Sequence, residues 1–356
     1  MGTFKELAKE LSNDDTVFVS AREGGKVVDW VSTGNYALNW AISNRFNRGY
    51  PLGHVVEIFG VESTGKSLLM ARAISEFQKA FGDGWTFLDD TENAFNPDWA
   101  ERSLGVDVDR LQLTGSVTIS EHFEAVKRIL HKAREKEKHV FIGLDSLALL
   151  MDEYEDTNEF VKDRPGSKAK EIRKLFRKTR PLVKGLPAMY MTTNHETTKI
   201  GGWGSPTTTT GGTGSRYQSS VRINLRKPKK IKKGSDIVGV MVRPHIEKTR
   251  FTTPFRETNL VIPFNASISK TSGLIPVLLE LGILKVKGRT LVYEGEDTGI
   301  YAQKTNPVKQ DASSAELLEK FPALLEKADK MLEEQEAEAS MDAGVNEEAD
   351  ISEEED

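Results

Sequence analysis

The chain has 356 residues, of which 38% are hydrophobic, enough to build one large domain or two unequal ones around a buried core. It has no cysteine, which excludes a disulfide framework and thiolate metal sites. No apolar run approaches the roughly 18 residues of a membrane span, and the first residues do not resemble a signal peptide. We therefore expect no membrane partner and a cytoplasmic location.

The net charge of −5 is unevenly distributed along the chain. Residues 333–356 contain 12 acidic side chains and no basic one, so residues 1–332 alone carry a net charge of +7. A basic body makes nucleic acid a plausible partner, with the acidic tail as a competitor for the same surface. The tail has almost nothing to bury, and we expect it to be disordered.

Helical and strand patterns alternate through the first part of the chain. The expected elements are a helix near 4–11, a helix at 34–49, a strand at 54–60, a helix at 67–81, a strand at 85–90, helices at 97–104 and 120–137, and strands at 139–145 and 188–194. This alternation predicts an α/β fold with a mainly parallel twisted sheet flanked by helices. Ligands of such sheets bind at the carboxyl ends of the strands.

Three further strand patterns, at 220–227, 236–248 and 259–264, should extend the sheet. Smaller elements follow from about residue 270 and predict a small carboxy-terminal α+β domain. The expected division is an amino-terminal helical region at 1–32, a core at 33–268, the small domain at 269–332, and the acidic tail at 333–356.

The most specific motif is GVESTGKS at residues 60–67, which matches G-x-x-x-x-G-K-[ST] between a strand and a helix. Its glycines let the backbone amides converge on phosphate oxygens at the start of the helix. Lys66 should reach the outer phosphates, and the Ser67 hydroxyl should ligate Mg²⁺. The expected nucleotide-binding residues of this loop are Gly60, Val61, Glu62, Ser63, Thr64, Gly65, Lys66, Ser67 and Leu68.

Polar side chains at the ends of the other strands complete the predicted site. Asp145 ends an apolar strand and is the expected carboxylate near the metal, which we take to be Mg²⁺. Asp89, Asp90 and Glu92 follow another strand, and any of them could orient and deprotonate the attacking water. His195 follows a third strand, where a γ-phosphate sensor would lie, although a lone histidine is more often structural.

These motifs, in this order, resemble the RecA recombinase family, and especially the phage UvsX-like recombinases. The resemblance covers most of residues 30–285, through TGNYALNWAI, VVEIFGVESTGKS, FLDDTENAFNPDWAERSLGVD, FIGLDSLALL, TTNHE and TTTTGGTGSRYQSSVRI. It implies an oligomerisation role for residues 1–32 and a RecA-like ATPase and DNA-binding core at 33–268. It also implies a DNA-dependent ATPase that uses ATP and Mg²⁺. Such a protein forms helical filaments on single-stranded DNA and catalyses homologous pairing and strand exchange in recombination, repair and recombination-dependent replication.

The implied partners are single-stranded DNA, homologous duplex DNA, further copies of the chain arranged head to tail, and single-strand-binding and mediator proteins. The implied location is the cytoplasm of a bacterial or phage-infected bacterial cell. Two alternatives remain, a hexameric helicase with the same fold and a recombination mediator that binds ATP without turnover. The set of Glu92, Asp145 and His195 argues against the second.

The resemblance also assigns residues around the nucleotide. Glu92 would orient the water, although its segment lies one residue further from the strand than usual, so Asp90 stays an alternative. Trp99 would stack on adenine with Asn96 near the base edge, and His195 would sense the γ-phosphate. In EKTR, Lys248 and Arg250 would reach the ATP bound to a neighbouring subunit.

Two loops would hold single-stranded DNA in this family. The first should span residues 154–170, with Lys162, Arg164, Lys168 and Lys170 as phosphate contacts. The second is the glycine-rich GGWGSPTTTTGGTG at 201–214, followed by a basic strand. Its expected contacts are Gly202, Trp203, Thr208, Thr209, Thr210, Gly211, Gly212, Arg216 and Arg222, although Trp203 could instead pin the loop to the core.

Overall fold

The computed structural model describes residue 6 and residues 27–157, 166–198, 207–264, 267–303 and 306–352. The helix expected near residues 4–11 falls outside these ranges, apart from Glu6. Among the described residues, no helix is both long and apolar enough to span a membrane.

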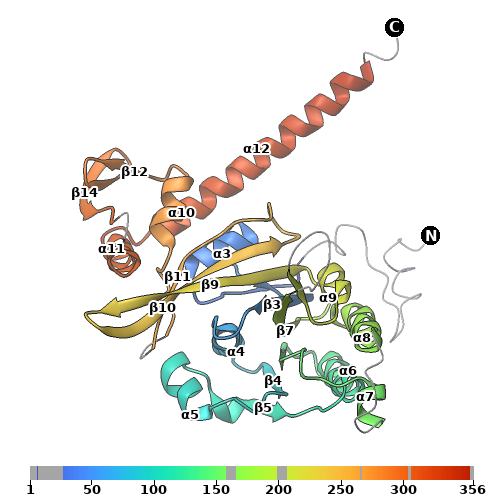
Figure 1. Ribbon diagram of the computed structural model, residues 1–356. Helices are drawn as coiled ribbons and strands as arrows, with labels where there is room; N and C mark the ends of the chain where they lie inside the picture. Colours follow the sequence, from blue (N-terminus) through green and yellow to red (C-terminus); the bar gives the residue numbers. More distant parts are fainter. Residues whose placement is uncertain are drawn as a thin grey trace.

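A large, mostly parallel sheet forms the centre of the molecule (Figure 1). The strand order is β11-β10-β9-β3-β7-β6-β4-β5, and β8 pairs with β7 beside this path. The strands are β3 His54–Gly60, β4 Trp85–Asp90, β5 Leu111–Thr114, β6 Val140–Asp145, β7 Ala188–Thr198, β8 Thr207–Thr209, β9 Val221–Lys233, β10 Asp236–Lys248 and β11 Leu260–Pro263. Strands β9, β3, β7, β6, β4 and β5 pair in parallel, whereas β8, β10 and β11 pair antiparallel. The predicted α/β fold is confirmed.

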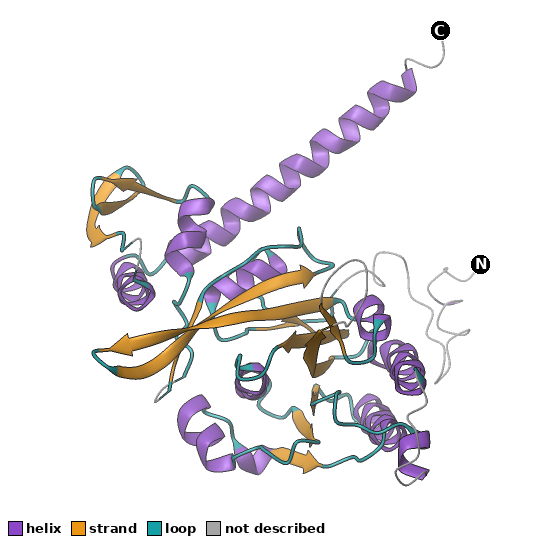
Figure 2. Cartoon of the chain, viewed as in Figure 1, coloured by secondary structure: helices purple, strands orange, loops and turns teal. Residues whose placement is uncertain are grey.

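Helices cover both faces of this sheet (Figure 2). Successive side chains of a strand point to opposite faces, and the two hydrophobic clusters follow this rule. In β6, Phe141 joins the cluster of α3 (Tyr36–Ser43) and α4 (Lys66–Ala80), whereas Ile142 joins the cluster of α6 (Ile119–Glu135) and α8 (Ser167–Val183). Continuous apolar runs in the central strands are therefore required because both faces are buried.

Short elements connect these layers. They are β1 Trp30–Val31, β2 Tyr50–Pro51, α5 Pro97–Trp99, a π-helical turn Ala100–Leu104, a 3-10 turn Val108–Arg110, α7 Glu153–Thr157 and α9 Thr213–Gln218. The sequence predicted neither β5 nor α8 as separate elements. Helix α8 instead overlaps the end of the first expected DNA loop.

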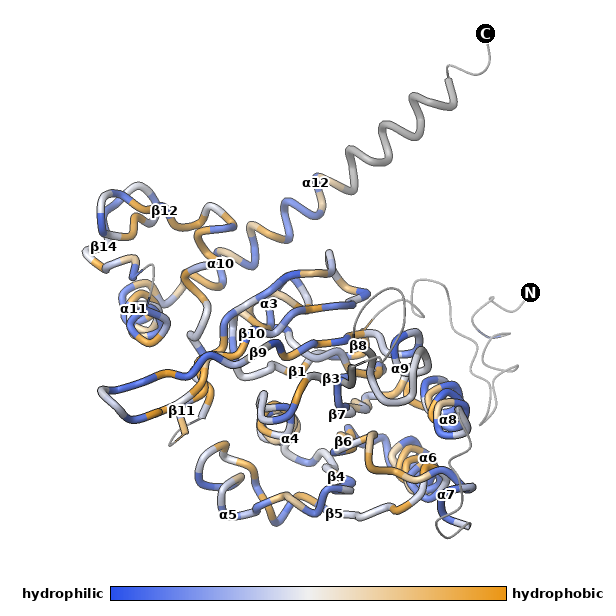
Figure 3. Tube along the Cα trace, in the orientation of Figure 1, coloured by the Kyte–Doolittle hydropathy of each residue, from blue (hydrophilic) through white to orange (hydrophobic). Residues whose placement is uncertain are grey.

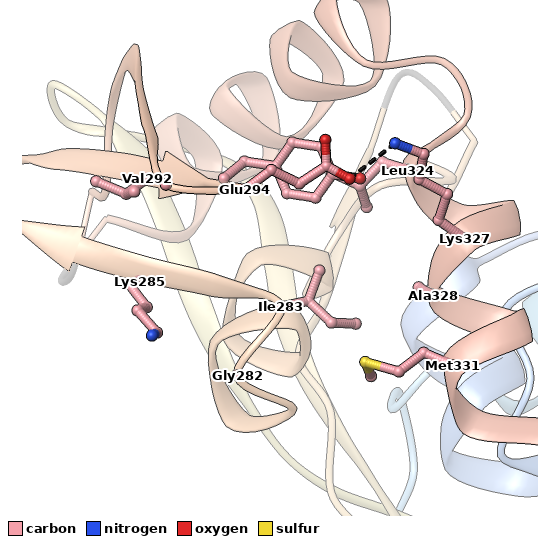
Figure 4. Close-up of a pocket in the computed structure, with 11 residues that line it drawn as sticks. Gly282, Ile283, Lys285, Val292, Glu294, Leu324, Lys327, Ala328 and Met331 are labelled. Carbon is pink, nitrogen blue, oxygen red and sulfur yellow. Dashed lines mark hydrogen bonds and ion pairs between the residues drawn. The ribbon is translucent and has the colours of Figure 1, made fainter. Parts of the chain in front are cut away.

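A small antiparallel sheet and three helices follow the central sheet. They are α10 Leu274–Glu280, β12 Leu284–Lys287, β13 Thr290–Tyr293, β14 Glu296–Tyr301, α11 Pro307–Lys320 and α12 Leu324–Ser352. A cavity of about 370 Å³ lies among Ile283, Val292, Leu324 and Met331, beside an ion pair of Lys327 with Glu294 at 2.7 Å (Figure 4). Its lining comes entirely from this carboxy-terminal part, so the cavity is separate from the phosphate-binding loop.

The structure differs from the expected disorder of the acidic tail, because α12 continues to Ser352 as a projecting helix (Figure 1). Glutamate, alanine, glutamine and methionine are good helix formers, so the segment can extend a helix whose first turns are packed. Two of its acidic residues also have partners in the core. Arg45 contacts Glu336 at 2.6 Å and Glu333 at 3.3 Å, and Asn44 donates a 2.6 Å hydrogen bond to Glu336.

Candidate nucleotide-hydrolysis site and DNA-contacting segments

The loop from Gly60 to Ser67 joins the carboxyl end of β3 to the first turn of α4. A Cβ on Gly60 would lie 2.6 Å from the carbonyl oxygen of Leu225, so only glycine fits there. Gly65 has a φ of 88° and is the cap of α4, a position that favours glycine. The free amides of a 15-residue helix therefore point toward the loop, which suits it to bind phosphate.

The Lys66 ammonium lies inside this loop. It donates hydrogen bonds to the carbonyl oxygens of Gly60 at 3.3 Å and Val61 at 3.0 Å. Burial lowers the pKa of Lys66, and the nearby carboxylates of Glu92 and Asp145 partly oppose this effect. The lysine is thus a buried cation placed to balance phosphate charge.

Asp145 lies at the carboxyl end of β6 and is only 9% exposed. Burial raises its pKa, whereas hydrogen bonds from Thr193 and Ser67 lower it. The Ser67 hydroxyl and the Asp145 carboxylate are thus neighbours and supply the oxygen ligands that Mg²⁺ prefers. Within the described ranges, no cluster of three or more His, Cys, Asp or Glu could hold a metal, so Asp145 would share the ion with the Ser67 hydroxyl and the nucleotide.

Asp89 and Asp90 are engaged in local structure. Asp89 is buried, 2.6 Å from His122 Nδ1, and accepts a 2.8 Å hydrogen bond from the Ser116 amide. Asp90 accepts hydrogen bonds from the amides of Ala94 at 3.3 Å and Phe95 at 2.8 Å. Both carboxylates stabilise the loops after β4 and β5, which weakens their case as the catalytic base.

Glu92 faces the phosphate loop and lies beside His195. Glu92 Oε1 and His195 Nε2 are 3.1 Å apart, and both side chains are a little under one third exposed. Burial would raise the pKa of Glu92, but the His195 contact and the Lys66 charge hold it below its usual range. Glu92 is therefore ionised at neutral pH and accessible to water, as a general base must be.

Asn96 and Trp99 follow the Glu92 loop. The Asn96 side chain caps α5 by accepting a 2.9 Å hydrogen bond from the Trp99 amide. Trp99 is 36% exposed, so its ring is open to stack on a base. The amide oxygen of Asn96 is already used in the cap.

Lys248 ends β10, and Arg250 lies two residues after it. Lys248 lies opposite Arg222 of β9, which in turn lies opposite Glu57 of β3. Burial lowers the pKa of His54, and the nearby charge of Arg250 lowers it further. His54 begins β3, about 20 Å before its end at Gly60. Arg250 therefore lies nearer the start of β3 than its end at the phosphate loop.

The first expected DNA loop is only partly described. Lys162 and Arg164 lie outside the described residues. Lys168 and Lys170 belong to the first turn of α8 and not to a loop, because the helix begins at Ser167 after Gly166. Lys168 is 3.6 Å from Glu155, so its charge is partly compensated.

The second expected DNA loop contains ordered segments at its end. Gly202 and Trp203 lie outside the described residues. Thr207–Thr209 forms β8, which places Thr208 opposite Thr197 in β7. The remaining predicted contacts lie between the end of β8 and the middle of α9; they are Thr209, Thr210, Gly211, Gly212 and Arg216.

Three of these residues differ in their surroundings. A Cβ on Gly211 would lie 2.6 Å from Ile172, so the chain packs closely against α8 there. A Cβ on Gly212 would meet nothing within 4 Å. The Arg216 side chain is 61% exposed and could contact phosphate. Figure 3 shows that the outer part of β9, which ends at Lys233, is also hydrophilic.

Arg222 does not fit the direct DNA contact expected from the sequence. It is 2% exposed, and its Nε lies 2.6 Å from Glu57 Oε2. A second nitrogen lies 2.8 Å from Glu247 Oε2. Sequence reasoning missed Glu57, although a charged residue in the apolar strand HVVEIFG was the available signal.

The phosphate loop, the helix after it and the carboxylate at the end of β6 define a P-loop nucleotide-binding protein. Residues 2–269 match the RecA N-terminal domain family. The chain belongs to the RecA family.

Curated relatives agree with this assignment. A mitochondrial DNA repair protein recA homolog from Dictyostelium discoideum is 32% identical over 85% of this chain and 67% of its own length. Protein RecA from Bacteroides thetaiotaomicron is 32% identical over 79% of this chain and 84% of its own. Protein RecA from Mycoplasmopsis pulmonis is 30% identical over 93% of this chain and 94% of its own.

The Glu92→Gln variant should lower ATP turnover by about 100-fold or more, because an amide cannot accept the proton of the attacking water. Nucleotide affinity should change little, since the phosphate loop is intact. Phosphate release and binding of a fluorescent ATP analogue measure the two effects. Asp90→Asn is the matched control, and a larger loss of turnover in that variant would reassign the base.

Proposed function

We propose that this protein is a DNA-dependent ATPase that forms filaments on single-stranded DNA and catalyses homologous pairing and strand exchange. The observation that carries the proposal is the 3.1 Å contact of Glu92 with His195, next to a phosphate loop. One residue is a base for hydrolysis, and the other lies on the strand that leads to the second DNA segment. Membership of the RecA family and the DNA repair name of one relative support this function.

The residues divide the chemistry of hydrolysis. Lys66 and the backbone amides of the loop bind the phosphates, and Glu92 orients a water and accepts its proton. Ser67 and Asp145 would hold Mg²⁺, which would supply positive charge to stabilise the developing negative charge on the phosphate oxygens. With ATP bound, His195 would contact the γ-phosphate and give up its contact with Glu92. Without a γ-phosphate, it would keep the Glu92 contact.

Binding of DNA follows from the segment after His195. Arg216 and the threonines and glycines at 208–212 contact the DNA backbone, together with the loop that contains Trp203. The partners are single-stranded DNA, homologous duplex DNA, and single-strand-binding and mediator proteins in the cytoplasm of a bacterial or phage-infected cell. The histidine at position 195 supports the UvsX-like branch.

Lys248 and Arg250 complete the site across the interface between subunits. Head-to-tail stacking would bring both residues to the ATP of the next copy, as the resemblance to the RecA family implies. Such stacking generates an open helical filament unless the rotation closes a ring. A ring is the assembly of the helicase alternative.

Electron microscopy with single-stranded DNA and a slowly hydrolysed ATP analogue tests the proposed assembly. We expect helical filaments on the DNA, because each interface adds the next copy in the same way. The same sample with ADP is the control and should contain few filaments. Closed rings would support the helicase alternative, and monomers alone would support the mediator.

The proposed role of Lys248 predicts a pH dependence. Burial lowers the pKa of Lys248 to about 8, with Arg250, Arg222 and Arg180 adding to the effect. Its positive charge is therefore present below pH 8 and is lost as the pH rises through this value. We expect kcat/KM for ATP in the presence of DNA to fall above about pH 8.

The Lys248→Arg variant should retain its charge and lose this alkaline decline, because an arginine stays protonated. Steady-state ATPase assays from pH 6.5 to 9.5 measure both proteins. An unchanged alkaline decline in the arginine variant would exclude Lys248 as its cause.

A further inference from the structure

A carboxylate is buried in the middle of the central sheet. Glu57 lies on β3 between apolar residues, three residues before the phosphate loop, and is 0% exposed. Its Oε1 accepts a 2.9 Å hydrogen bond from Asn194 Nδ2, and its Oε2 lies 2.6 Å from Arg222 Nε. Both oxygens thus have partners, on the strands that flank β3 on either side.

Asn194 connects this carboxylate to the nucleotide side. Its Oδ1 accepts a 2.8 Å hydrogen bond from the His195 amide, and its Nδ2 also donates to the Thr210 carbonyl at 3.0 Å. The Thr210 amide in turn donates to the His195 carbonyl at 3.4 Å. A shift of the His195 backbone must therefore change the contacts of Asn194 with both Glu57 and Thr210.

Arg222 connects the same carboxylate to the DNA side. One of its nitrogens contacts Glu247 at 2.8 Å, and another donates to the Thr209 hydroxyl at 3.4 Å. The second oxygen of Glu247 lies 3.4 Å from the exposed Arg216. The guanidinium also lies over the Phe59 ring, 4.4 Å from its centroid, which limits its freedom to turn.

A buried ion pair costs several kcal/mol of desolvation per ion, and apolar residues often stabilise a core as well or better. Stability alone therefore does not explain a glutamate and an arginine at these positions. The planar fork of arginine can contact two carboxylates in fixed directions, which the single ammonium of lysine cannot do. The arrangement instead fixes Arg222 against Glu57, Glu247 and Thr209 at once.

We propose that Arg222 is a positioning residue that couples the state of His195 to the DNA-contacting segment at residues 209–216. The coupling runs from His195 through Asn194 and Glu57 to Arg222, and from there to Thr209 and through Glu247 to Arg216. This inference rests on the proposed function, because the coupling would link ATP turnover at the phosphate loop to DNA binding at residues 209–216.

The Arg222→Lys variant tests the coupling while it keeps the buried charge. The lysine can contact Glu57 but cannot hold Glu247 and Thr209 at the same time. We expect DNA-free ATP turnover and nucleotide affinity to stay within about 2-fold of the wild type. The stimulation of turnover by single-stranded DNA should fall by about 10-fold, in the range of allosteric coupling energies.

The Arg110→Lys variant is the matched control. Arg110 also uses its fork for two contacts, with the carbonyl oxygens of Gln78 in α4 at 3.3 Å and of Phe81, the C-cap of the same helix, at 2.9 Å. It has no contact with His195 or with residues 209–216. We expect this variant to retain DNA stimulation, and thermal unfolding should show that both variants are folded at the assay temperature.

The doubly neutral Glu57→Gln/Arg222→Gln variant replaces Arg222→Lys if the latter unfolds, because it removes both buried charges together. The same loss of DNA stimulation is expected. Full stimulation in the folded variant overturns the inference and leaves the proposed function intact. A wild-type protein whose turnover does not respond to DNA overturns the proposed function, and the inference with it.

Discussion

Parallel pairing of β3 with β7 and of β4 with β6 is the constraint on which the candidate site depends. In the first pair Gly60 lies opposite His195, and in the second Asp90 lies opposite Asp145. Gly60, the first residue of the phosphate loop, and His195, the candidate sensor, are therefore neighbours on adjacent strands. The loop after β4 is held to the end of β6 by the Thr91 amide, which donates a 2.9 Å hydrogen bond to the Asp145 carbonyl.

The same sheet separates the phosphate loop from a basic residue proposed to reach the ATP of a neighbouring subunit. The carboxyl ends of the parallel strands meet at the phosphate loop, whereas Arg250 lies near His54 at the start of β3. One chain then offers a phosphate loop at one end of the sheet and a basic residue near the other. This polarity suits head-to-tail assembly, in which each ATP would contact two subunits.

Much of this arrangement could be predicted from the sequence, because local patterns determine it. The P-loop has a fixed spacing, and the strands of a sheet buried on both faces read as apolar runs. Polar residues directly after those runs must meet at one edge, so Glu92, Asp145 and His195 could be named together. The residue pattern alone offers no ground to prefer Glu92 to Asp90, whereas the structure shows that Asp90 accepts hydrogen bonds from the next turn.

Other features depend on contacts between distant residues. Arg222 looks like part of a basic surface strand until Glu57 and Glu247 are placed beside it. The acidic segment after residue 332 looks disordered by composition, but Glu333 and Glu336 contact Arg45, nearly 300 residues away in sequence. Lys168 was expected in a loop because no apolar run marks the start of α8.

The central claim is that the nucleotide at the phosphate loop sets the affinity for DNA. Fluorescence anisotropy with a labelled single-stranded oligonucleotide can measure this affinity with a slowly hydrolysed ATP analogue and with ADP. We predict binding about 10-fold tighter or more with the ATP analogue, the size of a typical coupling between two sites. Equal affinities with the two nucleotides would contradict the account.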